Sequence, residues 1–482
     1  MSQGAGVSQP ATETVLLPVS DHEMDGLPIP RRYFAMFANL AATAMSVLDG
    51  SIVNIALPTI ASDLGSSAAD TVWVVSIYQL ALVISLFPLS ALAERIGYRR
   101  VFVGGVVLFT LGSLACAVSP SLGMLVVARF VQGLGASGLL CISSGLTRYI
   151  YPSSQFGRAI GLTSLIVALS SAAGPSLGTG ILSISSWEWL FAINLPLGLL
   201  VLLTARHLPD VKGSKREIDY RSVALNAAMF GLIVVAVDRL GSQPKLAVPM
   251  ILIAITSALL LIRRESSREH PLVPLDLMKN ATFRQTLMAS ICAFSAQMLS
   301  FVALPFFLEH SLNYSPFKAG LFITPWPLAL ALTATFSARL ADRVRPLILC
   351  TIGITAVGSG LLLMAAFPLA DFIWPIIPFM MLCGIGFGLF QIPNNRVMLT
   401  SAPKTRSGAA GGAQASARQF GQAIGAAIMA VLFTRSDNDA PKLALIAAAI
   451  LCATAATVSF LNSRDIILFS RRAGGSRIEA SR

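Results

Sequence analysis

Long apolar runs recur along almost the whole chain, and they restrict its fold more than any other feature. A bilayer core about 30 Å thick requires roughly 20 apolar residues per helix, and the runs here have that length. Of the 482 residues, 55% are hydrophobic and 12% are charged, whereas a soluble domain carries roughly 25% charged residues. The sequence therefore predicts an all-α integral membrane protein with no room for an intervening soluble domain.

Counting the runs predicts fourteen transmembrane helices, separated into three groups by charged linkers at 206–221 and 263–284. The groups hold six, two and six spans. The predicted spans are 34–60, 72–92, 101–119, 121–147, 158–182 and 188–205, then 222–238 and 247–262, then 285–308, 318–340, 346–366, 372–396, 407–433 and 442–462.

An internal repeat supports this division. The segments "LAER" at 92–95 and "LADR" at 340–343 each end the second span of a six-span group. Parallel repeats related by an axis along the membrane normal are a transporter design, with the substrate site between them. We expect the two extra spans to be peripheral to the transport path. The predicted organisation is a tail 1–32, a six-helix half 33–205, linkers with two extra helices 206–284, a six-helix half 285–463, and a tail 464–482.

The basic residues predict the orientation. With a cytoplasmic N-terminus, only five of the 35 Lys and Arg fall outside: Arg239, Lys245, Lys318, Arg435 and Lys442. Arg129 and Arg418 lie within spans, and the remainder lie inside, as the positive-inside rule expects. We therefore expect both termini in the cytoplasm and the protein in the cytoplasmic (inner) membrane. The net charge of +12 is a topology signal with some attraction to anionic lipid, and it requires no nucleic-acid partner.

Cofactor, metal and enzyme signatures are not found in the sequence. Gly133, Gly135 and Gly138 spell GxGxxG, but within a membrane span rather than after a strand, so we interpret them as helix packing. No GxxxxGK[ST] phosphate loop occurs. The six cysteines are scattered without a CxxC, and the four histidines lie outside the apolar runs. We expect no cofactor, no metal and no enzymatic activity.

One carboxylate, Asp49, stands in the apolar stretch "MSVLDGSIVNIALPTI" at 45–60. A charge at this depth costs at least ~3 kcal/mol and normally faces a partner or a cavity. Counting 1.5 Å per residue, Asp49 and Arg129 differ in depth by only about 4 Å, so they can form a pair. Two interpretations stay open: a static ion pair that locks two helices, or a proton-coupling site at Asp49 that Arg129 modulates.

Uncharged polar and aromatic residues in other spans could line a cavity, although each one alone is more often an interhelical contact. Aromatic faces could also hold planar cations. The candidate cavity residues of these kinds are Asn54, Trp73, Tyr78, Gln79, Gln132, Asn194, Gln297, Trp326, Gln391, Asn394 and Gln414, with Phe301 as a further aromatic, and the charged Arg418 is the twelfth candidate.

Five ordered motifs carry a family resemblance: "LDGSIVNIALPTI", "LAERIGYRR", "RFVQGLGASG", "GPSLGTG" and "WEWLFAINLPLG". From about residue 34 to 462, the chain resembles the major facilitator superfamily and its fourteen-span drug:proton antiporters of the EmrB/QacA type. It departs from the family pattern at Ser90, Glu94, Thr179 and Arg345, which bears on gating details. The resemblance implies two pseudo-symmetric six-helix halves, a turn motif that gates the cytoplasmic side and a motif that marks antiporters. The turn-motif residues are Glu94, Arg95, Gly97, Arg99, Asp342 and Arg343, and the antiporter motif residues are Gly174, Pro175 and Gly178. Close helix packing is an equally good explanation of the latter three.

The leading hypothesis is a proton-coupled antiporter that exports small amphipathic, cationic drugs or toxic compounds by alternating access. The alternative is a dedicated exporter or symporter of a metabolite, peptide or siderophore. A receptor or intramembrane enzyme lacks support in the motifs. The expected partners are a small-molecule substrate, protons and the lipid bilayer. We expect a monomer, and an accessory adaptor protein stays open.

Overall fold

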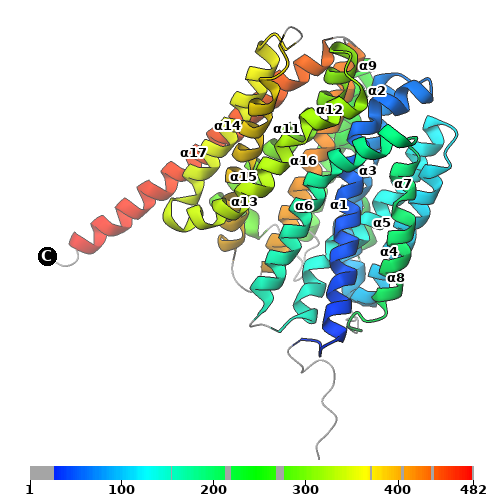
Figure 1. Cartoon of the computed structure of the whole chain (residues 1–482). Helices are drawn as coiled ribbons and strands as arrows, with labels where there is room; N and C mark the ends of the chain where they lie inside the picture. Colours follow the sequence, from blue (N-terminus) through cyan, green and yellow to red (C-terminus); the bar gives the residue numbers. More distant parts are fainter. Residues whose placement is uncertain are drawn as a thin grey trace, which may run out of the picture.

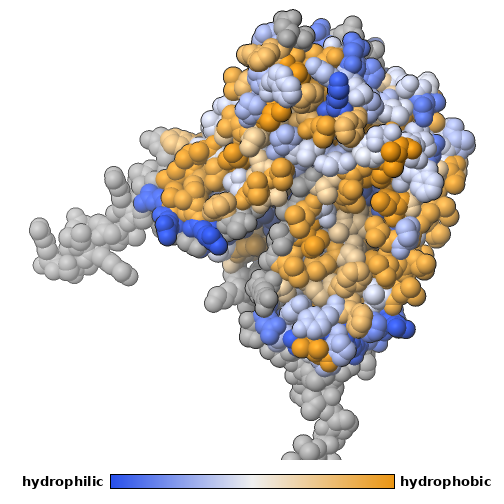
Figure 2. Space-filling view, viewed as in Figure 1, coloured by the Kyte–Doolittle hydropathy of each residue, from blue (hydrophilic) through white to orange (hydrophobic). Residues whose placement is uncertain are grey.

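The computed structural model describes residues 26–152, 155–211, 219–266, 276–369, 372–402, 407–435 and 439–479. Within these ranges every regular element is a helix, and the long helices stand side by side as a bundle (Figure 1). Ten of the helices described are long and apolar enough to cross a membrane. Hydrophobic residues cover much of the side surface, and the most hydrophilic ones gather mainly toward the ends (Figure 2). The prediction of an all-α membrane protein is therefore confirmed.

The N-terminal group of helices fills one side of the bundle (Figure 1). Ser67 and Ser121 stand before two of its helices, and their hydroxyl oxygens accept hydrogen bonds from the backbone N–H of Asp70 and Met124. Such caps satisfy backbone donors that have no partner inside the helix. The helices are α1 (Arg31–Asp63), α2 (Ala68–Thr71), α3 (Trp73–Ile96), α4 (Tyr98–Ala117), α5 (Leu122–Ile150), α6 (Phe156–Ile184), α7 (Trp189–Ala192) and α8 (Asn194–Ala205).

The C-terminal group fills the other side. Asn280 caps its first long helix by accepting from the backbone N–H of Thr282 at 3.0 Å. Two short segments, η2 (Leu277–Lys279) and η3 (Phe307–Ser311), flank that helix. The helices are α11 (Ala281–Phe306), α12 (Pro316–Ile323), α13 (Pro325–Arg343), α14 (Pro346–Ala366), α15 (Ile376–Thr400), α16 (Ser407–Arg435) and α17 (Ala440–Glu479).

A pair of helices, α9 (Tyr220–Ser242) and α10 (Pro244–Glu265), joins the two groups. Asn226 of α9 donates to the carbonyl of Ile84 in α3 at 3.1 Å, while Phe230 packs edge-on against Phe420 of α16 at 4.8 Å. Large apolar side chains of α10 are exposed, as on a lipid-facing helix. α9 therefore contacts a helix of each group, and the expectation that the pair is peripheral to the transport path stays a prediction.

Close glycine contacts repeat between the groups. A Cβ on Gly133 of α5 would meet the carbonyl oxygen of Tyr78 in α3. A Cβ on Gly384 of α15 would meet the carbonyl oxygen of Trp326 in α13. Tyr78 and Trp326 are separated along the chain by the same interval as the two turn motifs. The internal repeat is therefore visible in the helix packing as well.

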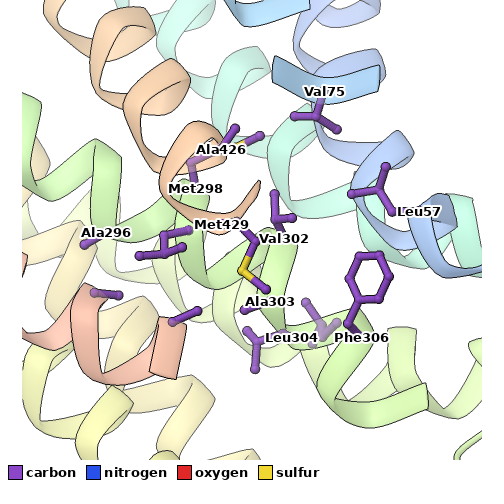
Figure 3. Close-up of a cluster of buried hydrophobic side chains, with 14 of the residues drawn as sticks. Leu57, Val75, Ala296, Met298, Val302, Ala303, Leu304, Phe306, Ala426 and Met429 are labelled. Carbon is purple, nitrogen blue, oxygen red and sulfur yellow. The ribbon is translucent and has the colours of Figure 1, made fainter. Parts of the chain in front are cut away.

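Two apolar clusters of the described residues contain side chains from both groups. The smaller joins α3 and α9 to α16 through Leu80, Val83, Val234, Ala423 and Ala427, and the other is much larger. We name the larger one the shared apolar cluster, and its members from the N-terminal group lie toward the end of the bundle that carries α2. Figure 3 shows members of it, among them Leu57 of α1, Val75 of α3, Met298 and Val302 of α11, and Met429 of α16. Toward the end where α1 begins, the described residues form two separate clusters instead, one within each group. The larger apolar contact between the two groups is thus at the α2 end, and the smaller cluster joins them farther along α3 and α16.

Candidate functional site

Asp49 lies on α1 with its side chain entirely shielded from solvent. Its Oδ2 pairs with Nη1 of Arg129 at 2.5 Å. Its Oδ1 accepts hydrogen bonds from Nε2 of Gln132 at 2.8 Å and from Nδ2 of Asn194 at 2.9 Å. Both carboxylate oxygens are therefore held, by donors from α5 and α8.

Arg129 is equally enclosed and has several partners. Its Nε donates to the carbonyl of Val74 at 3.1 Å, and its Nη1 also donates to Oε1 of Gln132 at 2.6 Å. The guanidinium carbon lies 4.1 Å from the ring centroid of Tyr78 and 5.6 Å from that of Phe191. An arginine over aromatic faces gains a further electrostatic attraction, which is larger when water is excluded.

Ser113 of α4 completes this polar network, which we define as Asp49, Arg129, Gln132, Asn194 and Ser113. The Ser113 hydroxyl lies 2.6 Å from Nε2 of Gln132 and 3.2 Å from Nδ2 of Asn194, and it accepts from both. Sequence reasoning missed Ser113, because one serine in an apolar span carries no signal. Four helices, α1, α4, α5 and α8, meet at the network.

The charge of the polar network explains what it can do chemically. With Asp49 ionised, its charge and that of Arg129 cancel. A proton on Asp49 would leave the guanidinium as an uncompensated buried charge, which is strongly unfavourable. Proton binding would therefore favour any arrangement of helices that lets water or another anion reach Arg129.

The predicted cavity residues of the N-terminal group are mostly buried in helix packing. Gln132 and Asn194 belong to the polar network, and the Tyr78 hydroxyl donates to the carbonyl of Ser46 at 3.2 Å. Asn54 and Gln79 are buried, and the side-chain oxygen of each lacks a hydrogen-bond partner among the described residues. Trp73, at the start of α3, is half-buried.

Two predicted cavity residues of the C-terminal group are buried as well. Asn394 donates to Oγ of Ser290 at 2.7 Å and to the carbonyl of Thr286 at 3.3 Å, so it joins α15 to α11. Trp326 packs edge-on against Phe301 at 5.0 Å between ring centroids.

The other four candidates are more accessible or lie at the limit of burial. Gln297 is 9% exposed, and Gln391, Gln414 and Arg418 are half-buried. None of them reaches the polar network by a hydrogen bond that involves described residues.

The turn motif after α3 depends on Gly97. Its φ of +101° lies in the region that favours glycine, and a Cβ there would meet the carbonyl oxygen of Val211 at 2.8 Å. In the same motif, the side chains of Glu94 and Arg99 are half-buried and that of Arg95 is exposed. In the corresponding turn of the C-terminal group, Arg343 is exposed. The Asp342 side chain lies outside the described residues. The predicted tight turn is thus present, whereas the gating role of these residues stays a prediction.

The antiporter motif packs α6 against α1. A Cβ on Gly174 would meet Cβ of Ser51 at 2.5 Å, and a Cβ on Gly178 would meet Cγ1 of Ile52 at 3.0 Å. Pro175 lies between them within the helix. These contacts fit close packing, and they also place the motif directly behind the helix that carries Asp49.

Metal chemistry has no visible site: in the described part of the chain, no group of three or more His, Cys, Asp and Glu could hold an ion.

Comparisons with known proteins support one family. The sequence profile of the Major Facilitator Superfamily matches residues 40–426. The "Uncharacterized transporter YebQ" of Escherichia coli K12 is 43% identical, covering 91% of this chain and 97% of that protein. "Riboflavin transporter RibZ" of Clostridioides difficile is 30% identical, covering 89% and 95%. "Multidrug export protein EmrB" of Escherichia coli K12 is also 30% identical, covering 82% and 79%. The solved structure of a POT family transporter shares the fold, with a TM-score of 0.68 and 16% identity over 91% of this chain and 96% of that one.

Proposed function

Because this chain belongs to the Major Facilitator Superfamily, we propose that it is a proton-coupled antiporter that exports small amphipathic compounds by alternating access. The buried Asp49–Arg129 pair is the observation that carries the proposal. A membrane protein excludes charge from its interior unless the charge is paired or used. Here the pair joins α1 to α5 inside one six-helix half, so a change in its protonation would alter how these two helices pack.

The proposal includes fourteen membrane spans in the order six, two, six. Ten helices satisfy length and hydropathy. The other four spans would be α6, α7 with α8, α12 with α13, and α16, which pack among those ten. The two halves would comprise 33–205 and 285–463. Both termini would lie in the cytoplasm, with the protein in the inner membrane.

With that orientation the conformation is inward-facing. The α2 end would be the outer one, and the shared apolar cluster closes it. Ser176 of α6 and Thr324, between α12 and α13, add a hydrogen bond of 3.1 Å across the groups. At the cytoplasmic end each group has its own core. Substrate would enter from the cytoplasm and leave after the outer cluster opens.

Protonation and opening would be linked through α1. Asp49 and Leu57 lie on this helix eight residues apart, or about 12 Å along its axis. Leu57 belongs to the shared apolar cluster, whereas Asp49 anchors α1 to α5 and α8. A proton taken up by Asp49 from the outside, after the outer closure has opened and the substrate has left, would weaken that anchor and let α1 shift back toward the inward-facing arrangement. Release of the proton to the cytoplasm would restore the anchor.

Transport by the purified protein in acid-loaded proteoliposomes tests this function. Protein molecules inserted inside-out have their cytoplasmic side facing the external medium. When the pH gradient is imposed, these wild-type molecules should carry ethidium, fluorescein or another small aromatic compound into the liposomes. Asp49→Asn should reduce gradient-driven uptake to the level of empty liposomes. Asp63→Asn, at the exposed end of the same helix, is the matched control and should behave as wild type. Wild-type rates in Asp49→Asn would return Asp49 to the role of a structural partner.

A second candidate is a dedicated exporter of one metabolite. The relative named a riboflavin transporter favours it, because it is as similar to this chain as EmrB is. A panel of unrelated dyes and biocides applied to cells that lack the protein separates the two. Loss of resistance to several compounds supports a broad exporter, whereas an unchanged panel with altered export of a single metabolite supports a dedicated one.

A further inference from the structure

Arg418 on α16 is a basic residue without a counter-ion among the described residues. The described part of the chain supplies no ion pair and no hydrogen bond to its side chain, which is half-buried. By helix rise, it lies about 16 Å from Ser407 and about 25 Å from Arg435, well inside the helix. A basic group at such a depth in a membrane protein normally faces a cavity or a partner.

The face of α16 that carries Arg418 leads to the closed outer end. Met429 lies on nearly the same line, about 20° away around the helix and three turns farther along. Met429 packs with Met298 and Val302 in the shared apolar cluster (Figure 3). Arg418 therefore stands on the cytoplasmic side of the closure, along the route that substrate would follow.

Two further polar side chains share this face. Gln414 and Gln422 lie four residues on either side of Arg418, about 40° around the helix. Both are half-buried, and neither has a hydrogen-bond partner among the described residues. By contrast, Gly421 and Gly425 on the neighbouring face pack tightly against α11. The face of α16 that carries Gln414, Arg418 and Gln422 is thus a different face from the one that packs tightly against α11.

The acid expected to receive a cation is already occupied. Both oxygens of Asp49 accept hydrogen bonds within the polar network, from Arg129, Gln132 and Asn194. A cationic substrate would have to displace a guanidinium from it. Between this fully paired carboxylate and a guanidinium that no described residue pairs, the latter is the group free to bind a charged ligand.

We propose that Arg418, with Gln414 and Gln422, forms a binding site for the oxyanion of an organic acid, a carboxylate or a comparable group. This inference rests on the proposed transport function, because it identifies the face with the substrate path, and it replaces the cationic substrate expected from the sequence. A guanidinium binds such oxygens through paired, planar N–H donors, and the glutamine amides add neutral donors. One monoanion exported for each proton imported moves two positive charges inward, so the membrane potential would drive the cycle as well as the pH gradient.

Equilibrium binding to the full-length protein in detergent, without a gradient, tests this site. The probes are fluorescein, a planar dianion, and ethidium, a planar monovalent cation, each followed by fluorescence anisotropy. Arg418→Gln should weaken fluorescein binding by about tenfold or more and leave ethidium binding unchanged or stronger. Arg418→Lys should retain most of the fluorescein affinity. Arg435→Gln, at the exposed end of the same helix, is the matched control and should match wild type.

Equal losses for both dyes in Arg418→Gln, unchanged fluorescein binding in that variant, or a wild-type protein that fails to bind fluorescein would each overturn the anion site. Gradient-driven uptake is measured separately. If fluorescein binding depends on Arg418 but no gradient-driven uptake is measured, the proposed function is contradicted and the anion site is supported. If uptake is measured but Arg418 has no effect on the preference for fluorescein, the anion site is contradicted and the proposed function is supported.

Discussion

The N-terminal and C-terminal groups can be compared residue by residue, because the same glycine contacts recur in both. A Cβ on Gly178 of α6 would meet the carbonyl oxygen of Ile52 in α1, just as a Cβ on Gly425 of α16 would meet the carbonyl oxygen of Ser295 in α11. Ile52 and Ser295 therefore occupy equivalent positions. This correspondence sets the register between α1 and α11.

A second set of contacts fixes the register between α5 and α15. Gly133 and Gly135 of α5 correspond to Gly384 and Gly386 of α15, since the members of each pair face equivalent helices of their own group. The two registers together identify the C-terminal counterparts of the polar network. They pair Asp49 with Cys292, Arg129 with Met380 and Gln132 with Cys383.

The two groups thus place different chemistry on one scaffold. The N-terminal positions hold a carboxylate, a guanidinium and an amide that bond to one another. The C-terminal positions hold sulfur-containing side chains, of which Met380 and Cys383 are fully buried. Since the C-terminal group packs without charge here, helix packing does not require the Asp49–Arg129 pair. The comparison therefore favours a functional role for the pair as a prediction, and four predictions test the comparison.

Arg129→Met copies the C-terminal residue into the N-terminal group and should have the largest effect. The Asp49 carboxylate would remain buried without its counter-charge, which destabilises a protein by about 3–5 kcal/mol. Thermal unfolding in detergent should therefore begin at a markedly lower temperature, and gradient-driven transport should be lost. Met380→Leu is the control in the other group and should change stability by less than about 1.5 kcal/mol. A variant Arg129→Met as stable as wild type would contradict the account.

Copying the whole C-terminal set should separate transport from stability. The triple variant Asp49→Cys, Arg129→Met, Gln132→Cys contains no unpaired charge, and replacing buried ion pairs by apolar groups is often neutral. Its free energy of unfolding should stay within about 2 kcal/mol of wild type, while the pH gradient should no longer drive uptake. Wild-type uptake by this variant would remove the functional meaning of the comparison.

The glycine contacts should be equally sensitive in both groups. A Cβ on Gly135 would meet Cα of Phe109 at 2.7 Å, and one on Gly386 would meet the carbonyl oxygen of Gly353 at 2.5 Å. Each Gly→Ala change should reduce stability by about 1–3 kcal/mol, because the backbones must move apart. Gly123→Ala, where nothing lies within 4 Å, should change it by less than about 1 kcal/mol. Tolerance at only one of the two sites would weaken the correspondence between α5 and α15.

The smallest effect is expected at the helix that joins the groups. Asn226→Ala removes the hydrogen bond from α9 to Ile84 of α3, which is worth about 1 kcal/mol. Uptake should therefore change by less than about fivefold, the factor to which about 1 kcal/mol corresponds. Complete loss of uptake in a folded variant would instead show that α9 takes part in coupling.

Much of the fold could be predicted from the sequence, because the membrane imposes a local rule. Each span must bury its backbone hydrogen bonds within itself and present apolar side chains to lipid, so helix positions follow from runs of about 20 residues. The internal repeat was readable from two short charged motifs. The contact between Asp49 and Arg129 was predictable too, since few charges lie at membrane depth and their depths match.

The sequence by itself therefore determined the class of protein, the helices and one ion pair. Only the tertiary structure decided which polar side chains bond to one another and which are left without a partner among the described residues. Gln132 and Asn194 read as cavity residues, yet they bond to Asp49, and Ser113 joined them without any local signal. From the sequence, Arg418 was one of twelve candidate cavity residues. In the structure, no described residue supplies its counter-ion. Such outcomes depend on the angle at which helices far apart in the sequence face one another. Hydropathy along one helix records depth and periodicity, and it carries no information about which neighbouring helix supplies a partner.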